Sequence, residues 1–309
     1  MVTIAARRSD RTTAGLQALL VTFLWSTSFI LTKWIFTIGG LGPLWLNALR
    51  YGSAAVVLLG YRALIKAPPW RTVLADRPGL LWQMIGLGII NYTIAQGGVT
   101  LGLKLLPSTH VALLLNLNNP VQVILFSALL LREMPIGIQS AGLGMGLVGA
   151  IAFYYPLTSP PGGWLGALPV IVCGVGYAIT TIYTRSLMRD GTVGALDLTV
   201  VSMVAGSLGM MLPAWAVEGL PILTAATAAY VGWLAVVNTA VAFTLWAHTQ
   251  KVLALFETTT INNTMLVQIA LLSWLLLGDP LRGLKLPAIL LVAAGTFLVQ
   301  AGPRLGRAR

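Results

Sequence analysis

Side-chain amides gather in one apolar stretch of the chain, residues 113–126, which reads LLLNLNNPVQVILF. Asn116, Asn118, Asn119 and Gln122 each offer hydrogen-bond donors and an acceptor, and Pro120 frees a backbone carbonyl in the turn before it. In apolar surroundings such groups are costly unless they bind something. The stretch therefore predicts either a polar ligand-binding surface or hydrogen bonds that hold neighbouring helices together, and the sequence leaves both open.

The same pattern returns 146 residues later, where residues 262–279 read NNTMLVQIALLSWLLLGD. Asn262, Thr264 and Gln268 take the places of the first, second and fourth amides of the earlier stretch. On a helix, Thr264 and Gln268 share one face with Glu257, which is the only acidic residue on a matched polar face. We expect Glu257 to carry a proton or to receive the ammonium group of a ligand.

Five further side chains are candidates because they are polar or aromatic within apolar runs: Arg50, Tyr92, Gln96, Tyr177 and Trp246. Arg50 is the deepest basic residue, and we expect it to attract a carboxylate or to bind a carbonyl at a helix end. The aromatic rings can hold an apolar or aromatic group by burial and stacking. Packing between helices is the alternative role for each of these residues.

Several kinds of chemistry have no support in the sequence. The chain lacks an HExxH motif, a Gly-rich phosphate loop and paired Cys/His spacing, and its one cysteine is Cys173. We therefore expect no metal, no cofactor and no enzymatic activity. The formal net charge is +11, but the basic residues are scattered, which argues against nucleic acid as a partner. The GLGMG segment at 142–146 is expected to allow close helix packing rather than to bind a nucleotide.

The composition predicts that a bilayer surrounds these residues. The chain has 309 residues, of which 57% are hydrophobic and only 9% charged, whereas soluble domains have about 25% charged residues. Runs of about 20 apolar residues can cross a bilayer as helices. We therefore predict an all-α membrane protein with ten transmembrane helices, at 14–37, 43–65, 79–103, 107–131, 136–156, 162–186, 196–217, 226–249, 253–277 and 284–301.

The basic residues are distributed unevenly between the two sides of this predicted membrane protein. With the N-terminus inside the cell, fourteen of the 19 lysines and arginines lie on the cytoplasmic side. Lys33, Lys104, Arg282 and Lys285 lie on the opposite side, and Arg50 lies within a span. Short cytoplasmic loops favour positive residues. The distribution therefore predicts ten spans with both termini in the cytoplasm.

The repeat predicts two five-helix halves, residues 1–156 and 157–309. Because five is an odd number, the second half enters the membrane in the opposite direction. Inverted repeats are typical of transporters that bind substrate near the bilayer centre and expose it alternately to either side. We expect the amides and the aromatic residues to line a central cavity.

Several motifs resemble those of the EamA type of the drug/metabolite transporter superfamily: WSTSF…K at 25–33, LRY at 49–51, REMP at 132–135 and LLLGDP at 275–280, which has Asp where Glu is more usual. The resemblance covers nearly the whole chain. It implies a multi-pass exporter of small-molecule substrates in a bacterial inner membrane. A monomer is one possible state of the protein, and the sequence does not determine the oligomeric state. Within the family the chain looks most similar to amino-acid exporters, and exporters of hydrophobic cationic drugs are the alternative.

Overall fold

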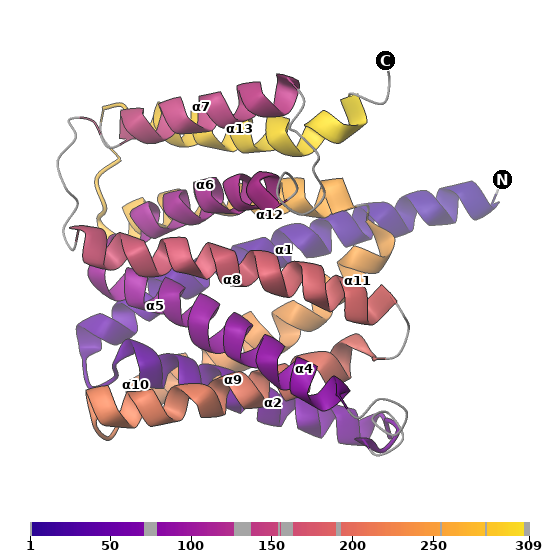
Figure 1. Ribbon diagram of the computed structural model, residues 1–309, viewed down its shortest axis with the longest axis vertical. Helices are drawn as coiled ribbons and strands as arrows, with labels where there is room; N and C mark the ends of the chain where they lie inside the picture. Colours follow the sequence, from indigo (N-terminus) through magenta and orange to yellow (C-terminus); the bar gives the residue numbers. More distant parts are fainter. Residues whose placement is uncertain are drawn as a thin grey trace. The chain divides into compact units, whose positions relative to one another are not determined.

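A computed structural model describes residues 2–70, 79–126, 137–153, 155, 163–189, 193–253, 255–281 and 283–305. Within these ranges every regular element is a helix (Figure 1). The all-α class predicted from composition and hydropathy is therefore confirmed for the described part of the chain.

Each of the ten predicted spans coincides with one helical stretch of the described chain. Seven stretches are single helices: α1 (Val2–Ile38), α2 (Pro43–Leu64), α6 (Ser108–Phe126), α7 (Gly137–Phe153), α8 (Gly163–Arg189), α9 (Ala195–Glu218) and α13 (Lys285–Leu305). The other three contain a π-helical segment: α4 (Leu80–Gly88), η1 (Ile89–Ala95) and α5 (Gln96–Leu105); α10 (Ala225–Ala235), η3 (Val236–Val241) and α11 (Ala242–Val252); and α12 (Leu255–Leu272) with η4 (Ser273–Leu277).

Length and hydropathy show that several of these helices can cross a bilayer. Six described segments are long and apolar enough: Thr12–Ile38, Leu80–Leu105, Gly163–Thr180, Ala195–Glu218, Ala225–Trp246 and Thr260–Leu277. Two apolar helical segments are shorter, Ser140–Phe153 and Lys285–Val299. Six helices of the described chain can therefore cross a membrane, and ten membrane crossings remain a prediction.

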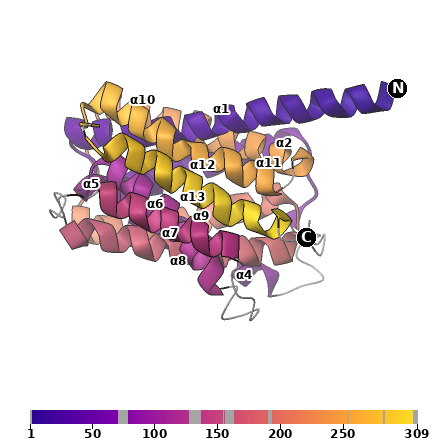
Figure 2. The same ribbon diagram turned by 90° about the horizontal axis from the view of Figure 1, so that it is seen from above.

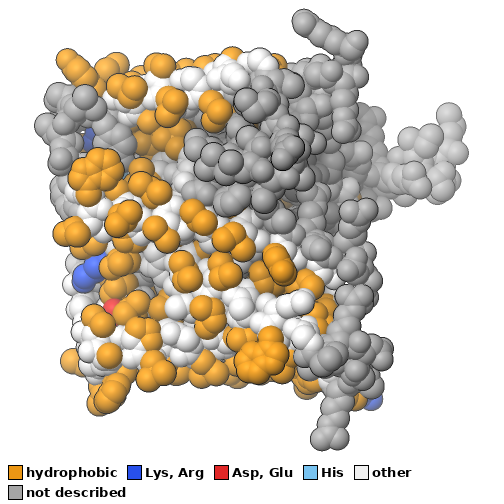
Figure 3. All heavy atoms as spheres, in the orientation of Figure 1, with side chains coloured by type: hydrophobic (Ala, Val, Ile, Leu, Met, Phe, Trp, Pro, Cys, Tyr) orange, Lys and Arg blue, Asp and Glu red, His pale blue; other side chains and the backbone are white. Residues whose placement is uncertain are grey.

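The surface of the described helices is apolar in the way that lipid contact requires. Hydrophobic side chains cover much of the face shown in Figure 3, and charged side chains are few there. Leu165, Trp164 and Leu212 are among the most exposed, at 80%, 79% and 74%. Exposed apolar area of this extent is unfavourable in water, so these side chains are suited to a hydrocarbon environment.

The chain divides into two compact units, and each contains segments from both predicted sequence halves. Unit 1 comprises residues 1–30, 105–167 and 242–309, and unit 2 comprises residues 31–104 and 168–241. The residues predicted from the repeated amide pattern lie in unit 1, whereas Arg50, Tyr92, Gln96 and Tyr177 lie in unit 2. The predicted halves, residues 1–156 and 157–309, follow the sequence repeat. The division into units follows contacts, so it does not test that prediction.

In unit 1, α7 and α13 lie side by side with their backbones in contact (Figure 1). A Cβ atom on Gly142 would lie 2.6 Å from the carbonyl oxygen of Gly295, and a Cβ on Gly295 would lie 2.5 Å from the carbonyl oxygen of Gly142. Neither position has room for a side chain. The expectation that GLGMG allows close helix packing is therefore confirmed, because Gly142 begins that segment.

The repeat-related helices α6 and α12 also pack together in unit 1, and α12 lies beside α13 (Figures 1 and 2). The glycine contact between α7 and α13 follows the same repeat. At the repeat offset of 146 residues, Gly149 of α7 corresponds to Gly295 of α13, and Gly146 of α7 to Val292 of α13. A Cβ on Gly149 would lie 2.8 Å from Val292 Cγ2, and a Cβ on Gly295 would lie 2.7 Å from the backbone nitrogen of Gly146. The contact between these two repeat positions thus occurs twice, once from Gly149 of α7 to α13 and once from Gly295 of α13 to α7.

In unit 2, α2 and α9 pack antiparallel and are tied together at both ends. The carboxylate of Glu218, at the end of α9, accepts hydrogen bonds from the backbone N–H groups of Leu44 and Trp45 at 2.8 and 3.0 Å. These N–H groups have no partner within the first turn of α2, so the carboxylate satisfies them and complements the helix dipole. At the other end, Arg62 forms an ion pair of 2.6 Å with Asp197.

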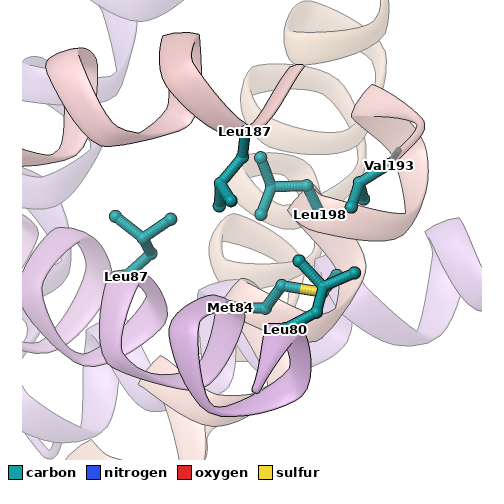
Figure 4. Close-up of a cluster of buried hydrophobic side chains, with 6 residues drawn as sticks. All are labelled: Leu80, Met84, Leu87, Leu187, Val193 and Leu198. Carbon is teal, nitrogen blue, oxygen red and sulfur yellow. The ribbon is translucent and has the colours of Figure 1, made fainter. Parts of the chain in front are cut away.

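A hydrophobic cluster fixes α4 against α8 and α9 at one end of unit 2 (Figure 4). Its members are buried aliphatic side chains and one methionine: Leu80, Met84, Leu87, Leu187, Val193 and Leu198. Close approach of α4 to α9 is possible because Gly88 has no side chain, since a Cβ there would lie 2.3 Å from the carbonyl oxygen of Ser202. Apolar packing and a glycine contact therefore set the position of the segment that continues into η1.

The π-helical segments η1 and η3 interrupt repeat-related spans and share one feature of sequence. Each has an asparagine as its third residue, Asn91 in η1 and Asn238 in η3. In η3 the hydroxyl of Thr239 donates to the carbonyl of Leu234, five residues earlier, at 2.8 Å. Short π-helical segments inside α-helices are found mainly at functional sites, so both segments direct attention to the residues around them.

Candidate functional site

Arg50 lies in α2, about two turns from the start of the helix, and is half-buried. Its Nε donates to the hydroxyl of Thr239 in η3 over 3.0 Å. Its Cζ lies 5.2 Å from the centroid of the Tyr51 ring, which is a cation–π contact. Within the described residues no carboxylate pairs with Arg50, and the groups that contact its guanidinium are neutral.

Three tyrosines lie near this arginine in unit 2. The rings of Tyr51 and Tyr92 pack at 4.8 Å between centroids with an interplanar angle of 51°. Tyr177 of α8 lies within electrostatic range of Arg50, Tyr51 and Tyr92. The structure therefore brings three of the predicted residues, Arg50, Tyr92 and Tyr177, into one cluster. Tyr51 and Thr239 belong to the same cluster and were not predicted.

Gln96, also predicted, is bound through its backbone rather than through its amide. Its carbonyl accepts from Asn47 Nδ2 at 3.1 Å and from the hydroxyl of Thr100 at 3.0 Å. Thr100 lies 2.8 Å from Asn47 Oδ1 as well. Asn47 was missed, although a signal was available: Asn47, Arg50 and Tyr51 have the i, i+3, i+4 spacing of one helix face.

In unit 1 the side-chain amide of Gln268, one of the predicted site residues, forms hydrogen bonds with other side chains of the protein. Its Oε1 accepts from the hydroxyl of Ser26 in α1 at 2.9 Å. Its Nε2 donates to Thr264, one turn earlier in α12, at 3.0 Å and to Thr22 in α1 at 3.3 Å. The arrangement joins α1 to α12, which is the interhelical role that the sequence left open for these amides.

The predicted Trp246 belongs to an aromatic cluster in the same unit. The ring of Trp25 lies 5.1 Å from that of Trp246 and 5.4 Å from that of Phe243, each at an interplanar angle of 57°. The indole nitrogen of Trp25 is buried and has no hydrogen-bond partner among the described residues. Trp25 neighbours Ser26 in the chain, so the aromatic cluster and the Gln268 network adjoin.

The remaining predicted residues lie on α6 and α12. Asn116, Asn118 and Asn262 are half-buried, and the side-chain oxygen of Asn116 has no partner in the described part of the chain. The backbone of Asn119, Gln122 and Glu257 is helical, but their side chains lie outside the described residues. Among the residues that the structure describes, no group of three His, Cys, Asp or Glu side chains could hold a metal ion.

Comparison with known families covers nearly the whole chain in two matches. The model of the EamA-like transporter family matches residues 12–155 and again residues 164–301. The chain belongs to the EamA-like transporter family. Membership makes it a multi-pass membrane transporter of small molecules and confirms the resemblance of its motifs to the EamA type. It also explains why one pattern of amides occurs twice, because each match covers one EamA-like copy.

Solved structures share the fold of this EamA-like chain. One of them, described only as "Crystal structure of protein", is 21% identical and superimposes with a TM-score of 0.66, covering 96% of this chain and 99% of its own. At this identity the likeness establishes the fold alone. No curated protein sequence gives a significant match to the chain.

Proposed function

We propose that this EamA-like protein exports amino acids, including aromatic and hydrophobic ones, or similar small metabolites across a bacterial inner membrane. Export proceeds by alternating access through a central cavity, without a cofactor and without enzymatic chemistry. The protein acts as a monomer that crosses the membrane ten times and keeps both termini in the cytoplasm. The nearest resemblance of its motifs, to amino-acid exporters of the family, supports this substrate class.

The observation that carries the proposal is the setting of Arg50. It is a basic side chain of α2, the helix of the predicted span 43–65, and the described residues around it supply a hydroxyl and aromatic rings instead of a carboxylate. Ionisable residues within membrane spans are rare and usually functional. A substrate with a carboxylate supplies the missing charge, and the rings of Tyr51 and Tyr92 can pack against its apolar part.

The other predicted residues have complementary roles in this proposal. The amides of α6, Asn116, Asn118, Asn119 and Gln122, offer hydrogen bonds to polar groups of the substrate. Glu257 of α12 receives the substrate's amine or carries a proton. On α12 itself, Gln268 binds Thr264 and also Ser26 and Thr22 of α1, which supports a role in holding the helices beside the transport path.

The alternative, export of hydrophobic cationic drugs, calls for unpaired carboxylates near the transport path. The described acidic side chains are occupied: Asp197 pairs with Arg62, Glu218 binds the start of α2, and Asp279 lies 3.3 Å from the hydroxyl of Thr109. These three carboxylates therefore give no support to a cationic substrate.

Counterflow in proteoliposomes tests the proposal directly. Purified protein is reconstituted with unlabelled leucine or phenylalanine inside and the labelled amino acid outside, without a pH gradient or voltage. We expect saturable uptake that Arg50→Gln abolishes and Lys66→Gln retains, since both variants lose one positive charge but Lys66 is an exposed residue outside the helices. Uptake of labelled tetraphenylphosphonium without uptake of any amino acid would establish the alternative.

A further inference from the structure

Arg50 uses only one of its three guanidinium nitrogens for a hydrogen bond within the described structure. Nε donates to Thr239, and Cζ lies beside the Tyr51 ring. The terminal nitrogens Nη1 and Nη2 have no hydrogen-bond partner among the described residues. Arg50 belongs to the predicted membrane span 43–65, and a partly unsatisfied guanidinium within such a span is costly. The Nη1–Nη2 edge therefore has both the charge and the donors to bind an anion.

Thr239 determines which edge of the guanidinium is held. Its hydroxyl donates to the carbonyl of Leu234 at 2.8 Å, so it can only accept from Arg50. That internal bond spans five residues and belongs to the π-helical segment η3. With Nε bound at 3.0 Å, the guanidinium is anchored on one side and its opposite side is left for a ligand. Thr239 is thus a positioning residue for Arg50.

We infer that the Nη1–Nη2 edge of Arg50 binds the carboxylate of the transported substrate, with Thr239 holding the guanidinium in place. The inference rests on the proposed function. It limits the 'similar small metabolites' of that proposal to organic molecules that, like amino acids, have one carboxylate. Two parallel N–H groups match the two oxygens of a planar carboxylate.

The neighbours of Arg50 favour one negative charge rather than two. Its described contacts are the hydroxyl of Thr239 and the ring of Tyr51, with the tyrosines 92 and 177 nearby, and none of these is basic. A single arginine balances a carboxylate but leaves a phosphate dianion half compensated.

The first test compares competitors that differ only at the carboxylate. Counterflow of labelled leucine by the wild-type protein is competed with leucine, leucinamide and leucine methyl ester. Because a charge-assisted bidentate contact is lost, we expect the amide and the ester to compete about 30-fold more weakly than leucine. Equal competition by leucinamide would overturn the carboxylate assignment while leaving amino-acid export intact.

The second test needs no transport and separates the two proposals. The melting temperature of purified protein is followed with rising 4-methylpentanoate or 4-methylpentanamide. We expect the acid alone to raise it, in the wild type and in Lys66→Gln but not in Arg50→Gln. An equal shift by the amide, no shift in the wild type, or a shift retained in Arg50→Gln would overturn the inference. An Arg50-dependent shift without leucine exchange would overturn amino-acid export only.

The positioning role of Thr239 is tested by two variants of similar size. Thr239→Val removes the acceptor for Nε, and we expect the KM for leucine to rise about tenfold with the maximal rate within a factor of about two. Thr239→Ser retains the hydroxyl and should restore the wild-type KM. Wild-type kinetics in Thr239→Val, with normal melting behaviour, would exclude Thr239 from this role.

Discussion

Two polar clusters within this apolar chain differ in how fully they satisfy themselves. Around Gln268 in unit 1, both amide hydrogens and one lone pair of the side chain bind Thr22, Ser26 and Thr264. Around Arg50 in unit 2, one nitrogen of the guanidinium is bound, and the terminal pair has no hydrogen-bond partner among the described residues. The first cluster links helices, whereas the second has capacity for another molecule.

The difference teaches how polar residues in membrane helices can be sorted. Scarcity alone marks both clusters, and hydrogen bonds between membrane helices are worth only about 0.6 kcal/mol each on average. What separates them is the number of donors and acceptors left after the protein's own contacts are made. An amide whose donors and acceptor are all hydrogen-bonded within the protein contributes to stability. A buried charge without an acidic partner lowers the stability of the protein in the absence of ligand.

The largest expected effect is on transport by Arg50→Met. The variant should lower leucine counterflow about 100-fold, because the proposed charge-assisted contact to the carboxylate is lost. Its melting temperature should stay the same or rise, since an apolar side chain replaces a charge that lacks an acidic partner. A marked fall in melting temperature would place Arg50 in the same structural class as Gln268, and Lys66→Gln serves as the control for charge.

The next effect is on stability, in Gln268→Leu. Three hydrogen bonds are removed, so the free energy of unfolding should fall by about 2 kcal/mol. Transport by the protein that remains folded should fall by less than about tenfold, a cost smaller than that of Arg50→Met. Denaturation in mixed micelles measures the first quantity and counterflow the second. Loss of transport at full stability would make Gln268 a substrate ligand instead.

A double-mutant cycle sharpens the view of this network. Ser26→Ala and Gln268→Leu both remove the bond between Ser26 and Oε1 of Gln268. The effect of the double variant on unfolding free energy should fall short of the sum of the single effects by about 1 kcal/mol. Additive effects would mean that the two side chains stabilise the protein independently, despite their separation of 2.9 Å.

The smallest expected effect concerns the aromatic cluster beside the network. Trp246→Leu removes a ring that packs against Trp25 at 5.1 Å. The unfolding free energy should fall by about 1 kcal/mol through loss of ring packing, and Trp246→Phe should recover part of it. A fall in transport without a change in stability would show that Trp246 contacts the substrate.

The helices themselves were readily predicted from the sequence. Apolar runs near 20 residues mark each stretch, and breaks such as Gly278, which has a φ of 72°, mark ends. The π-helical segments were not predicted, because η1 and η3 have the same apolar composition as the α-helical turns around them. Hydropathy reports the environment of a residue and is insensitive to one extra residue in a turn.

The candidate site was predicted only in part. Arg50, Tyr92 and Tyr177 were identified by polarity or aromatic character within apolar runs, which depends on each residue alone. Thr239 was missed because it lies 189 residues from Arg50, and no local pattern connects them. Likewise, the bond between Ser26 and Gln268 spans 242 positions, so the sequence could suggest an interhelical amide but could not name its partner.

The glycine contact between α7 and α13 also bears on how such a chain evolves. Gly149 and Gly295 occupy equivalent positions in the two EamA-like copies, and each touches the other copy. In a half-length protein that paired with itself through this face, each codon of the contact would set the residue in both copies at once. In a single chain that holds both copies, each codon can change separately. Yet the backbone of the opposite helix occupies the space at Gly295, so the structure still restricts this position to glycine although its codon can change separately.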